Sequence, residues 1–241
     1  MCIYIPITEE NIMNSDNRTY GEWSGLDTCI VLVAWLILST ETLFNGAGKI
    51  FDKLFSSPVI ADYMGAIVIH LVQLIIVGVF VLSKHQISWK NFGFRSISKQ
   101  NIKKLFLWSI IGLILNATFL SLTALVWSGE ASKADTIQST GFFLSIVMVA
   151  IIAPIVEEIV FRGVIYKYFR VKMGVPIAIL INGFLFGINH APSWELVLNA
   201  AVMGVFFAYT YERSGTLWIP IIVHGLTNTA VTTLFFLLVG T

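Results

Sequence analysis

The stretch Gly141–Arg170 reads GFFLSIVMVAIIAPIVEEIVFRGVIYKYFR. It is long enough to cross a bilayer, and it carries charges near its middle at Glu157, Glu158 and Arg162. A hydrocarbon core about 30 Å thick requires roughly 20 mostly apolar residues in one helix. An ionisable residue at that depth costs about 2.5–3.5 kcal/mol on insertion scales, so it is a functional candidate by default. The stretch therefore predicts a transmembrane helix that carries a polar site.

The composition of the whole chain is that of a membrane protein. Its 241 residues are 56% hydrophobic and 12% charged, and the mean hydropathy is +0.82. Soluble domains carry about 25% charged residues, so the excess apolar surface must face a lipid bilayer. These values exclude a soluble α/β enzyme and a disordered scaffold. The net charge of +1 gives no electrostatic basis for a nucleic-acid partner, and none is expected.

Apolar stretches recur along the chain and predict an all-α fold, a polytopic membrane bundle of about seven transmembrane helices within a range of six to eight. The first stretch is the weakest because Glu41 interrupts it. The polar N-terminal segment lacks the basic region and cleavage site of a signal peptide, so we expect no processing. The stretches are Leu26–Phe44, Val59–Leu82, Leu105–Trp127, Gly141–Arg170, Val175–His190, Trp194–Tyr211 and Thr216–Val239.

The lysines and arginines fall unevenly on the two sides of the predicted bundle. If the helices alternate in direction, eleven of these residues share one side and three the other, which is the asymmetry of the positive-inside rule. We therefore expect a multi-pass protein of a bacterial plasma membrane with its N-terminus in the cytoplasm. The eleven are Arg18, Lys84, Lys90, Arg95, Lys99, Lys103, Lys104, Lys167, Arg170, Lys172 and Arg213, and the three are Lys49, Lys53 and Lys133.

The charges within Gly141–Arg170 have different environments if the helix continues through them. Glu158 and Arg162 are four residues apart with the acid first, which favours an ion pair on one helical face. Glu157 points about 100° away around the helix, so Arg162 does not neutralise it and Glu157 is left for acid–base chemistry. The alternative is a helix that ends near Val156, with all three charges at the membrane interface.

His190 is predicted to lie at the same depth as Glu157. Glu157 precedes the polar turn at Gly174 by 17 residues, and His190 follows that turn by 16. In an antiparallel hairpin both side chains then lie roughly 24 Å from the turn. This meeting within the membrane requires a helix that is continuous through the charges. A helix that ended at Val156 would leave the two side chains at opposite faces.

Histidine and asparagine are also paired in the last apolar stretch. His224 and Asn228 are four residues apart, hence on one helical face, at about 12 Å and about 18 Å from Thr216. A lone histidine in an apolar helix is more often a hydrogen-bonded packing residue than a catalyst. We assign that structural or solvated role to His70 and His85.

Three short motifs therefore lie in order on three apolar stretches: Glu157-Glu158-x-x-x-Arg162, Phe186-x-x-x-His190 and His224-x-x-x-Asn228. This pattern resembles the CPBP family (CAAX protease and bacteriocin-processing, also called Abi) of intramembrane endopeptidases, which includes the type II prenyl-protein endopeptidase. The resemblance covers roughly residues 141–239. It divides the chain into a polar N-terminal segment (1–25), N-terminal transmembrane helices (26–140) and a CPBP-like catalytic core (141–239).

The resemblance implies a peptidase that activates a water molecule. Glu157 is then the general base, and His190 helps to orient and deprotonate the water. His224 and Asn228 become donors to the negative charge of the tetrahedral intermediate. A supporting role falls to the remaining motif residues, Glu158, Arg162 and Phe186. The implied substrate is a membrane-associated peptide or small membrane protein: a leader, a pheromone precursor, a bacteriocin or a CAAX-like tail.

No cofactor is predicted, and a zinc ion is the alternative. One glutamate and two histidines, here Glu157, His190 and His224, match a zinc ligand set that leaves an open position. However, the chain has no His-Glu-x-x-His pair, and Asn228 beside His224 is typical of a donor array. The sequence therefore favours catalysis by glutamate without a metal.

Two other classes of function fit the same residues. In a proton-coupled transporter, Glu157, His190 and His224 would form a proton relay, which predicts flux across liposomes and no peptide cleavage. A non-catalytic membrane scaffold or bacteriocin-immunity protein would keep its phenotype when Glu157 or His190 is replaced by alanine.

Overall fold

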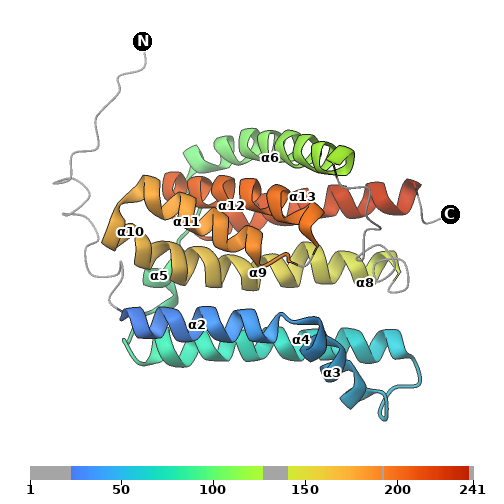
Figure 1. Cartoon of the computed structure of the whole chain (residues 1–241). Helices are drawn as coiled ribbons and strands as arrows, with labels where there is room; N and C mark the ends of the chain where they lie inside the picture. The colour runs from blue at the N-terminus through green and yellow to red at the C-terminus, as the bar shows by residue number, and fades with distance from the viewer. Residues whose placement is uncertain (1–22, 127–140, 192, 239–241) are drawn as a thin grey trace.

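The computed structural model describes residues 23–126, 141–191 and 193–238, and every regular element in these ranges is helical. The predicted all-α membrane bundle is confirmed. Figure 1 shows α6 on one side of the central helices and α2 and α4 on the other. The elements are α2 (Gly25–Leu38), α3 (Glu41–Phe51), α4 (Pro58–Val77), η1 (Gly78–Ser83), α5 (Trp89–Phe92), α6 (Lys99–Val126), α8 (Phe142–Ile146), η2 (Val147–Ile152), α9 (Ala153–Glu158), η3 (Ile159–Tyr166), α10 (Lys167–Met173), α11 (Val175–Ile188), α12 (Trp194–Ser214) and α13 (Trp218–Leu238).

Several helices of the described part are membrane-length. Four are long and apolar enough to cross a bilayer by length and composition, and α2 and α11 are shorter apolar helices. The polar segment predicted at the N-terminus lies almost wholly in residues 1–22, outside the described residues, as do Arg18 and Lys133. The four long helices are Pro58–Ser83, Lys99–Thr123, Phe142–Met173 and Trp218–Leu238.

The first predicted stretch, Leu26–Phe44, is wrong as a single helix. The chain leaves the helical conformation after α2 and restarts at α3, with Thr40 extended (φ −70°, ψ 142°). The Thr40 hydroxyl donates to the Ile37 carbonyl at 2.9 Å, which satisfies one of the acceptors that the end of α2 leaves open. The restarted helix packs on α4 at two glycines: a Cβ on Gly65 would lie 2.5 Å from the nitrogen of Gly48. Close helix contact through small residues stabilises this turn in the chain.

The helix that carries the paired glutamates is continuous. Five elements, α8, η2, α9, η3 and α10, join end to end over Phe142–Met173. The expected continuity through Glu157 and Arg162 is therefore present, and the alternative of an end near Val156 is wrong. Two segments of this helix, η2 and η3, have the wider π-helical turn, which is frequent at functional sites and rotates the face that follows it.

The hairpin of α11 and α12 packs closely because both helices offer glycine at the contact. A Cβ on Gly187 would meet the Ala201 Cβ at 2.7 Å, and a Cβ on Gly204 would meet the Phe186 Cβ at 2.8 Å. Small residues at such spacing let two membrane helices approach closely. Helix α11 has 14 residues and is therefore about 21 Å long, shorter than the hydrocarbon core of a bilayer, and the turn that carries His190 follows it directly.

The surface of α6 fits a lipid environment. Its outer face exposes large apolar side chains, whereas Trp108, Ser109 and Asn116 are buried against the bundle. This pattern inverts the polar exterior of a soluble protein. The exposed apolar side chains of α6 include Phe106, Leu107, Ile114, Leu122 and Leu125.

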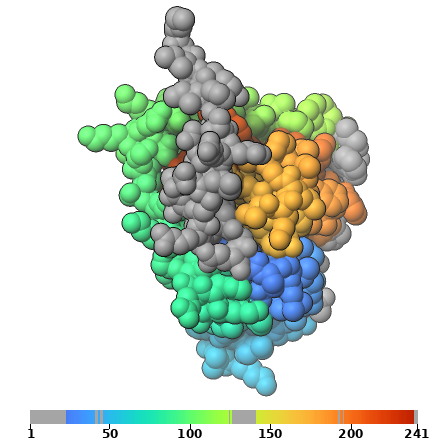
Figure 2. Space-filling model, turned by 90° about the vertical axis from the view of Figure 1, so that its left-hand side faces the viewer, coloured from blue at the N-terminus to red at the C-terminus, as the bar shows by residue number. Residues whose placement is uncertain are grey.

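The segments that hold most of the basic residues meet at one end of the bundle. Figure 2 views this end, where the segment around residues 84–99 (green) adjoins α2 (blue) and α10 (orange). Lys84 and His85 contact the buried carboxylate of Asp27 at 2.7 and 3.0 Å, and Arg170 pairs with Glu212 at 2.7 Å. His85 thus contacts a buried carboxylate, which is a structural role. His70 hydrogen-bonds Gln73 one turn away at 2.9 Å and is structural, as expected.

Candidate active site

A cavity of about 370 Å³ lies between α6, the long helix, α11, α12 and α13. Its wall includes all four predicted catalytic side chains, Glu157, His190, His224 and Asn228, together with Phe186. The sequence placed these residues on three separate stretches, and the fold brings them to one chamber. Most of the remaining wall is apolar, which is usual for a ligand site with a few polar groups.

Pro154 explains how α13 is positioned in this wall. Proline has no N–H to donate. In an α-helix the N–H of residue 154 would bond to the carbonyl of Ala150, and in the π-helical segment just before it to the carbonyl of Val149. Pro154 therefore leaves these two carbonyls without that partner. The Asn228 side-chain nitrogen donates to Val149 O at 2.7 Å. Gly225 lies against Ala150 O, where a Cβ would come within 2.5 Å. Helix α13 therefore docks where Pro154 leaves carbonyl groups open.

Glu158 and Arg162 form the ion pair that their spacing predicts. Arg162 Nη1 lies 2.9 Å from Glu158 Oε1, and both side chains are fully buried behind the cavity wall. Arg162 Nη2 also donates to the Gly204 carbonyl at 2.9 Å, and its guanidinium lies 4.6 Å from the ring centre of Phe186 and 5.3 Å from that of Phe207. These contacts offset part of the loss of hydration of a buried charge.

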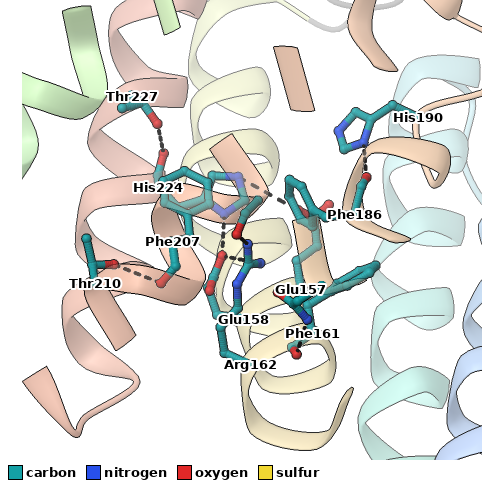
Figure 3. A network of polar contacts seen from close by, with 12 residues as sticks. Glu157, Glu158, Phe161, Arg162, Phe186, His190, Phe207, Thr210, His224 and Thr227 are labelled. Carbon is teal, nitrogen blue, oxygen red and sulfur yellow. Dashed lines mark hydrogen bonds and ion pairs between the residues drawn. The ribbon is translucent and has the colours of Figure 1, made fainter. Parts of the chain in front are cut away.

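His224 contacts both glutamates, as Figure 3 shows. Its Nδ1 lies 2.9 Å from Glu158 Oε1, and its Nε2 lies 3.7 Å from Glu157 Oε2. The imidazole stacks on Phe207 at 4.5 Å with 23° between the planes. The motif spacing did not predict the contact of Glu158 with His224 or the stacking on Phe207, because both join residues far apart in the chain.

His190 lies in the turn after α11, where the backbone holds its imidazole. His190 Nδ1 is 2.9 Å from the carbonyl oxygen of Phe186, which can only accept, so Nδ1 carries the proton. The Phe186 ring also contacts His190, at 5.2 Å between centres. The preceding residue, Asn189, accepts a hydrogen bond from Trp35 Nε1 at 2.7 Å, so α2 helps to fix this turn. No sequence pattern indicates this contact, because it joins residues that are 154 positions apart.

Catalysis without a metal stays a prediction. Over the residues that the structure describes, no group of three or more histidine, cysteine, aspartate or glutamate side chains is arranged to hold a metal ion. In particular, Nδ1 of His224 faces Glu158, which is itself paired with Arg162. We therefore derive no step through a metal.

The chain is similar to known proteins over its C-terminal part. Residues 139–230 match the family described as type II CAAX prenyl endopeptidase Rce1-like. The candidate membrane peptidase YdiL of Bacillus subtilis (strain 168) is 40% identical over 97 residues, which are 40% of this chain and 38% of YdiL. The UPF0177 protein YaiH of Lactococcus lactis subsp. lactis (strain IL1403) is 30% identical over 96 residues, 40% of this chain and 39% of YaiH.

These matches cover only part of each protein. The chain spans about two fifths of the length of the curated relatives that it matches. No solved structure matches it. The matched segment contains Glu157, His190, His224 and Asn228, the polar residues that converge on the cavity. Residues 139–230 are thus similar to the type II CAAX prenyl endopeptidases, the resemblance that the three sequence motifs predict.

Proposed function

We propose that this chain is an intramembrane endopeptidase that hydrolyses a peptide bond of a membrane-associated peptide or small membrane protein. The observation that carries the proposal is the convergence of Glu157, His190, His224 and Asn228 on one cavity inside a membrane bundle. Peptide hydrolysis requires an activated water, donors to the developing oxyanion and a proton for the leaving amine. This cavity holds side chains suited to each task.

Glu157 is the proposed general base. Its carboxylate takes a proton from the attacking water and returns that proton to the leaving nitrogen as the tetrahedral intermediate collapses. His190 assists because its Nδ1 proton is directed to the Phe186 carbonyl, which leaves the lone pair of the neutral ring on Nε2. That nitrogen accepts a hydrogen bond from the water and orients it. The attack then forms the new C–O bond, and the amine leaves with the returned proton.

His224 and Asn228 are the proposed oxyanion donors. Asn228 uses one N–H of its amide on Val149 O and has a second N–H for the substrate oxygen. His224 donates from Nε2 when Nδ1–H is directed to Glu158, a state with both nitrogens protonated. Glu157, Glu158, Arg162 and His224 then carry two negative and two positive charges, so the cluster is neutral. Fixed donors in a water-poor cavity stabilise the oxyanion without reorganisation.

The first prediction concerns the general base. Wild type and Glu157→Gln, each reconstituted in liposomes, are incubated with a panel of leader-like, pheromone-like, bacteriocin-like and CAAX-like membrane peptides, and products are identified by mass spectrometry. We expect cleavage by wild type and a loss of about 10²–10⁴-fold in Glu157→Gln, the usual contribution of a positioned acid–base group. A strong chelator should leave the wild-type rate unchanged, and equal cleavage by Glu157→Gln would remove the proposed base.

Glu212→Gln is the matched control for this experiment. Glu212 and Glu157 have the same side-chain exposure, 17%, but Glu212 pairs with Arg170 at the end of the bundle and does not line the cavity. We expect Glu212→Gln to cleave at the wild-type rate. Proton flux through the same liposomes without any cleavage would instead support the transporter.

The cavity wall and the distribution of basic residues support a substrate class and an orientation in the membrane. The largely apolar cavity wall supports a peptide with apolar side chains, and the gathering of basic segments at one end of the bundle supports a plasma-membrane protein with that end in the cytoplasm. A cysteine-accessibility measurement at Lys90, compared with Lys53 at the opposite end, checks the orientation.

A further inference from the structure

The cavity has a second polar feature that the proposed mechanism does not use. Asn116, on α6, and Asn199, on α12, both line the wall, and Asn199 Nδ2 donates to Asn116 Oδ1 at 2.8 Å. Asn199 Oδ1 is buried and has no hydrogen-bond partner over the described part of the chain. Asn116 lies outside the segment that matches the family, so this amide pair joins the two parts of the molecule.

Helix packing alone accounts poorly for these amides. A hydrogen bond between asparagines can join two membrane helices, but that role uses only one donor and one acceptor. A buried acceptor that stays unpaired costs roughly 1–3 kcal/mol, so it requires an explanation. The neighbouring wall residues include Leu120, Leu196 and Met203, and a leucine at either position would suit that surface. The pair therefore points to a ligand.

The hydrogen-bonding groups that the asparagine pair does not use internally match those of one peptide unit. After the internal hydrogen bond, the pair has the acceptor Asn199 Oδ1 and the amide hydrogens of Asn116 Nδ2, and a peptide group presents one N–H and one C=O. A substrate must be unwound around the bond to be cleaved, which frees main-chain groups that cannot reach water inside a bilayer. Partners for those groups must therefore come from the cavity wall.

We propose that the Asn116–Asn199 amide pair is a subsite that binds a main-chain peptide group of the unwound substrate beside the scissile bond. This inference rests on the proposed peptidase function. The substrate N–H donates to Asn199 Oδ1, and the substrate carbonyl accepts from Asn116 Nδ2. Such a subsite recognises an extended backbone rather than a particular side chain. It positions the scissile carbonyl toward Glu157 and does not itself take part in proton transfer.

The test measures steady-state cleavage by Asn199→Leu, with the panel peptide that wild type cleaves fastest. We expect KM to rise roughly tenfold, as for the loss of one or two hydrogen bonds, with little change in kcat. Asn182→Leu is the matched control, because Asn182 Oδ1 is also buried without a partner over the described residues but Asn182 does not line the cavity. Asn182→Leu should lower thermal stability and leave KM unchanged.

An ester substitution in the peptide supplies a second readout that loss of folding cannot imitate. Replacing the substrate N–H next to the scissile bond by an ester oxygen should raise KM for wild type, whereas Asn199→Leu should show no further rise with the same ester. Wild-type KM in Asn199→Leu, or equal ester effects in both proteins, would overturn the subsite while leaving the peptidase intact. No cleavage by wild type would overturn the peptidase and the subsite together.

Discussion

His224 is held on several sides by contacts that define its chemistry. Glu158 Oε1 lies 2.9 Å from His224 Nδ1, and Glu157 Oε2 lies 3.7 Å from His224 Nε2. The Phe207 ring stacks on the imidazole. Because Glu158 Oε1 also accepts from Arg162, one buried carboxylate joins the guanidinium of Arg162 to the imidazole of His224. Glu158 therefore acts as a positioning residue for His224, although it does not line the cavity.

Replacement of Glu158 by glutamine tests this arrangement. Removing one partner of a buried pair leaves an uncompensated charge, so we expect the free energy of unfolding to fall by about 3–5 kcal/mol. His224 Nδ1 should also face a neutral amide in place of a carboxylate oxygen, which should change the NMR signals of the imidazole. Thermal unfolding and the ¹⁵N NMR signals of histidine measure the two effects. Wild-type stability with an unchanged His224 signal would show that the pair has no such role.

For single residues, the sequence predicts contacts within one helix, because helical spacing determines them, and it does not predict contacts between helices. Glu158 and Arg162 are four residues apart and form their pair. Glu158 and His224 are 66 residues apart, and no periodicity relates them. The angle of Glu157 on the helix predicts that Arg162 does not neutralise it, and the structure adds that His224 Nε2 lies 3.7 Å from its carboxylate.

Among the elements, the junction of α13 with the long helix is set by Pro154 and Gly225. The proline removes a backbone donor, and the glycine lets α13 approach the carbonyl of Ala150 that the proline leaves. This contact places the face of α13 that carries His224 and Asn228 in the cavity. The proline was visible in the sequence, but the partner of the carbonyls it frees was not.

Gly225→Ala tests this junction. The new Cβ would lie 2.5 Å from Ala150 O, which is backbone, so α13 must move. We expect a loss of about 1–3 kcal/mol in the free energy of unfolding, as for overpacked cores, and a parallel loss of cleavage. Gly78→Ala is the control: it also changes a helical glycine, but nothing lies within 4 Å of its Cβ. Equal stability of the two variants would contradict the proposed close contact.

Hydropathy and the thickness of the bilayer predict where most of the helices lie, but not where one apolar stretch is broken into two helices. An apolar stretch long enough to cross a bilayer predicts that a helix is present. The long helix, α11, α12 and α13 lie in their expected stretches. The break between α2 and α3 depends on a local cap at Thr40 and on glycine contacts with α4. Those contacts join separate stretches, so hydropathy could not locate the break beyond the warning given by Glu41.

For the molecule as a whole, the N-terminal helices support the site although the family match begins only at residue 139. Trp35 on α2 donates to Asn189 and packs edge-on against Phe161, with ring centres 5.6 Å apart. On α5, the ring of Phe92 fills the space beside Gly163, and Lys167 donates to the Phe92 carbonyl. The N-terminal helices thus contact the long helix and the turn after α11, the two segments that carry Glu157 and His190.

Trp35→Phe tests whether α2 supports the turn that carries His190. Phenylalanine keeps an aromatic ring against Phe161 but removes the Nε1–H donor to Asn189. We expect a small fall in the free energy of unfolding, about 1 kcal/mol, because one hydrogen bond is lost. Cleavage should fall several-fold, because the imidazole of His190 is held less firmly. Unchanged cleavage, with the stability loss present, would show that α2 contributes to stability alone.

The most direct test of the central claim is the cleavage of one membrane peptide by wild type, Glu157→Gln and Glu212→Gln in the same liposomes. We predict one defined cut by wild type and Glu212→Gln at equal rates, and a rate about 10²–10⁴-fold lower for Glu157→Gln when all three are equally folded. Cleavage by Glu157→Gln at the rate of Glu212→Gln would contradict hydrolysis by the carboxylate in this cavity.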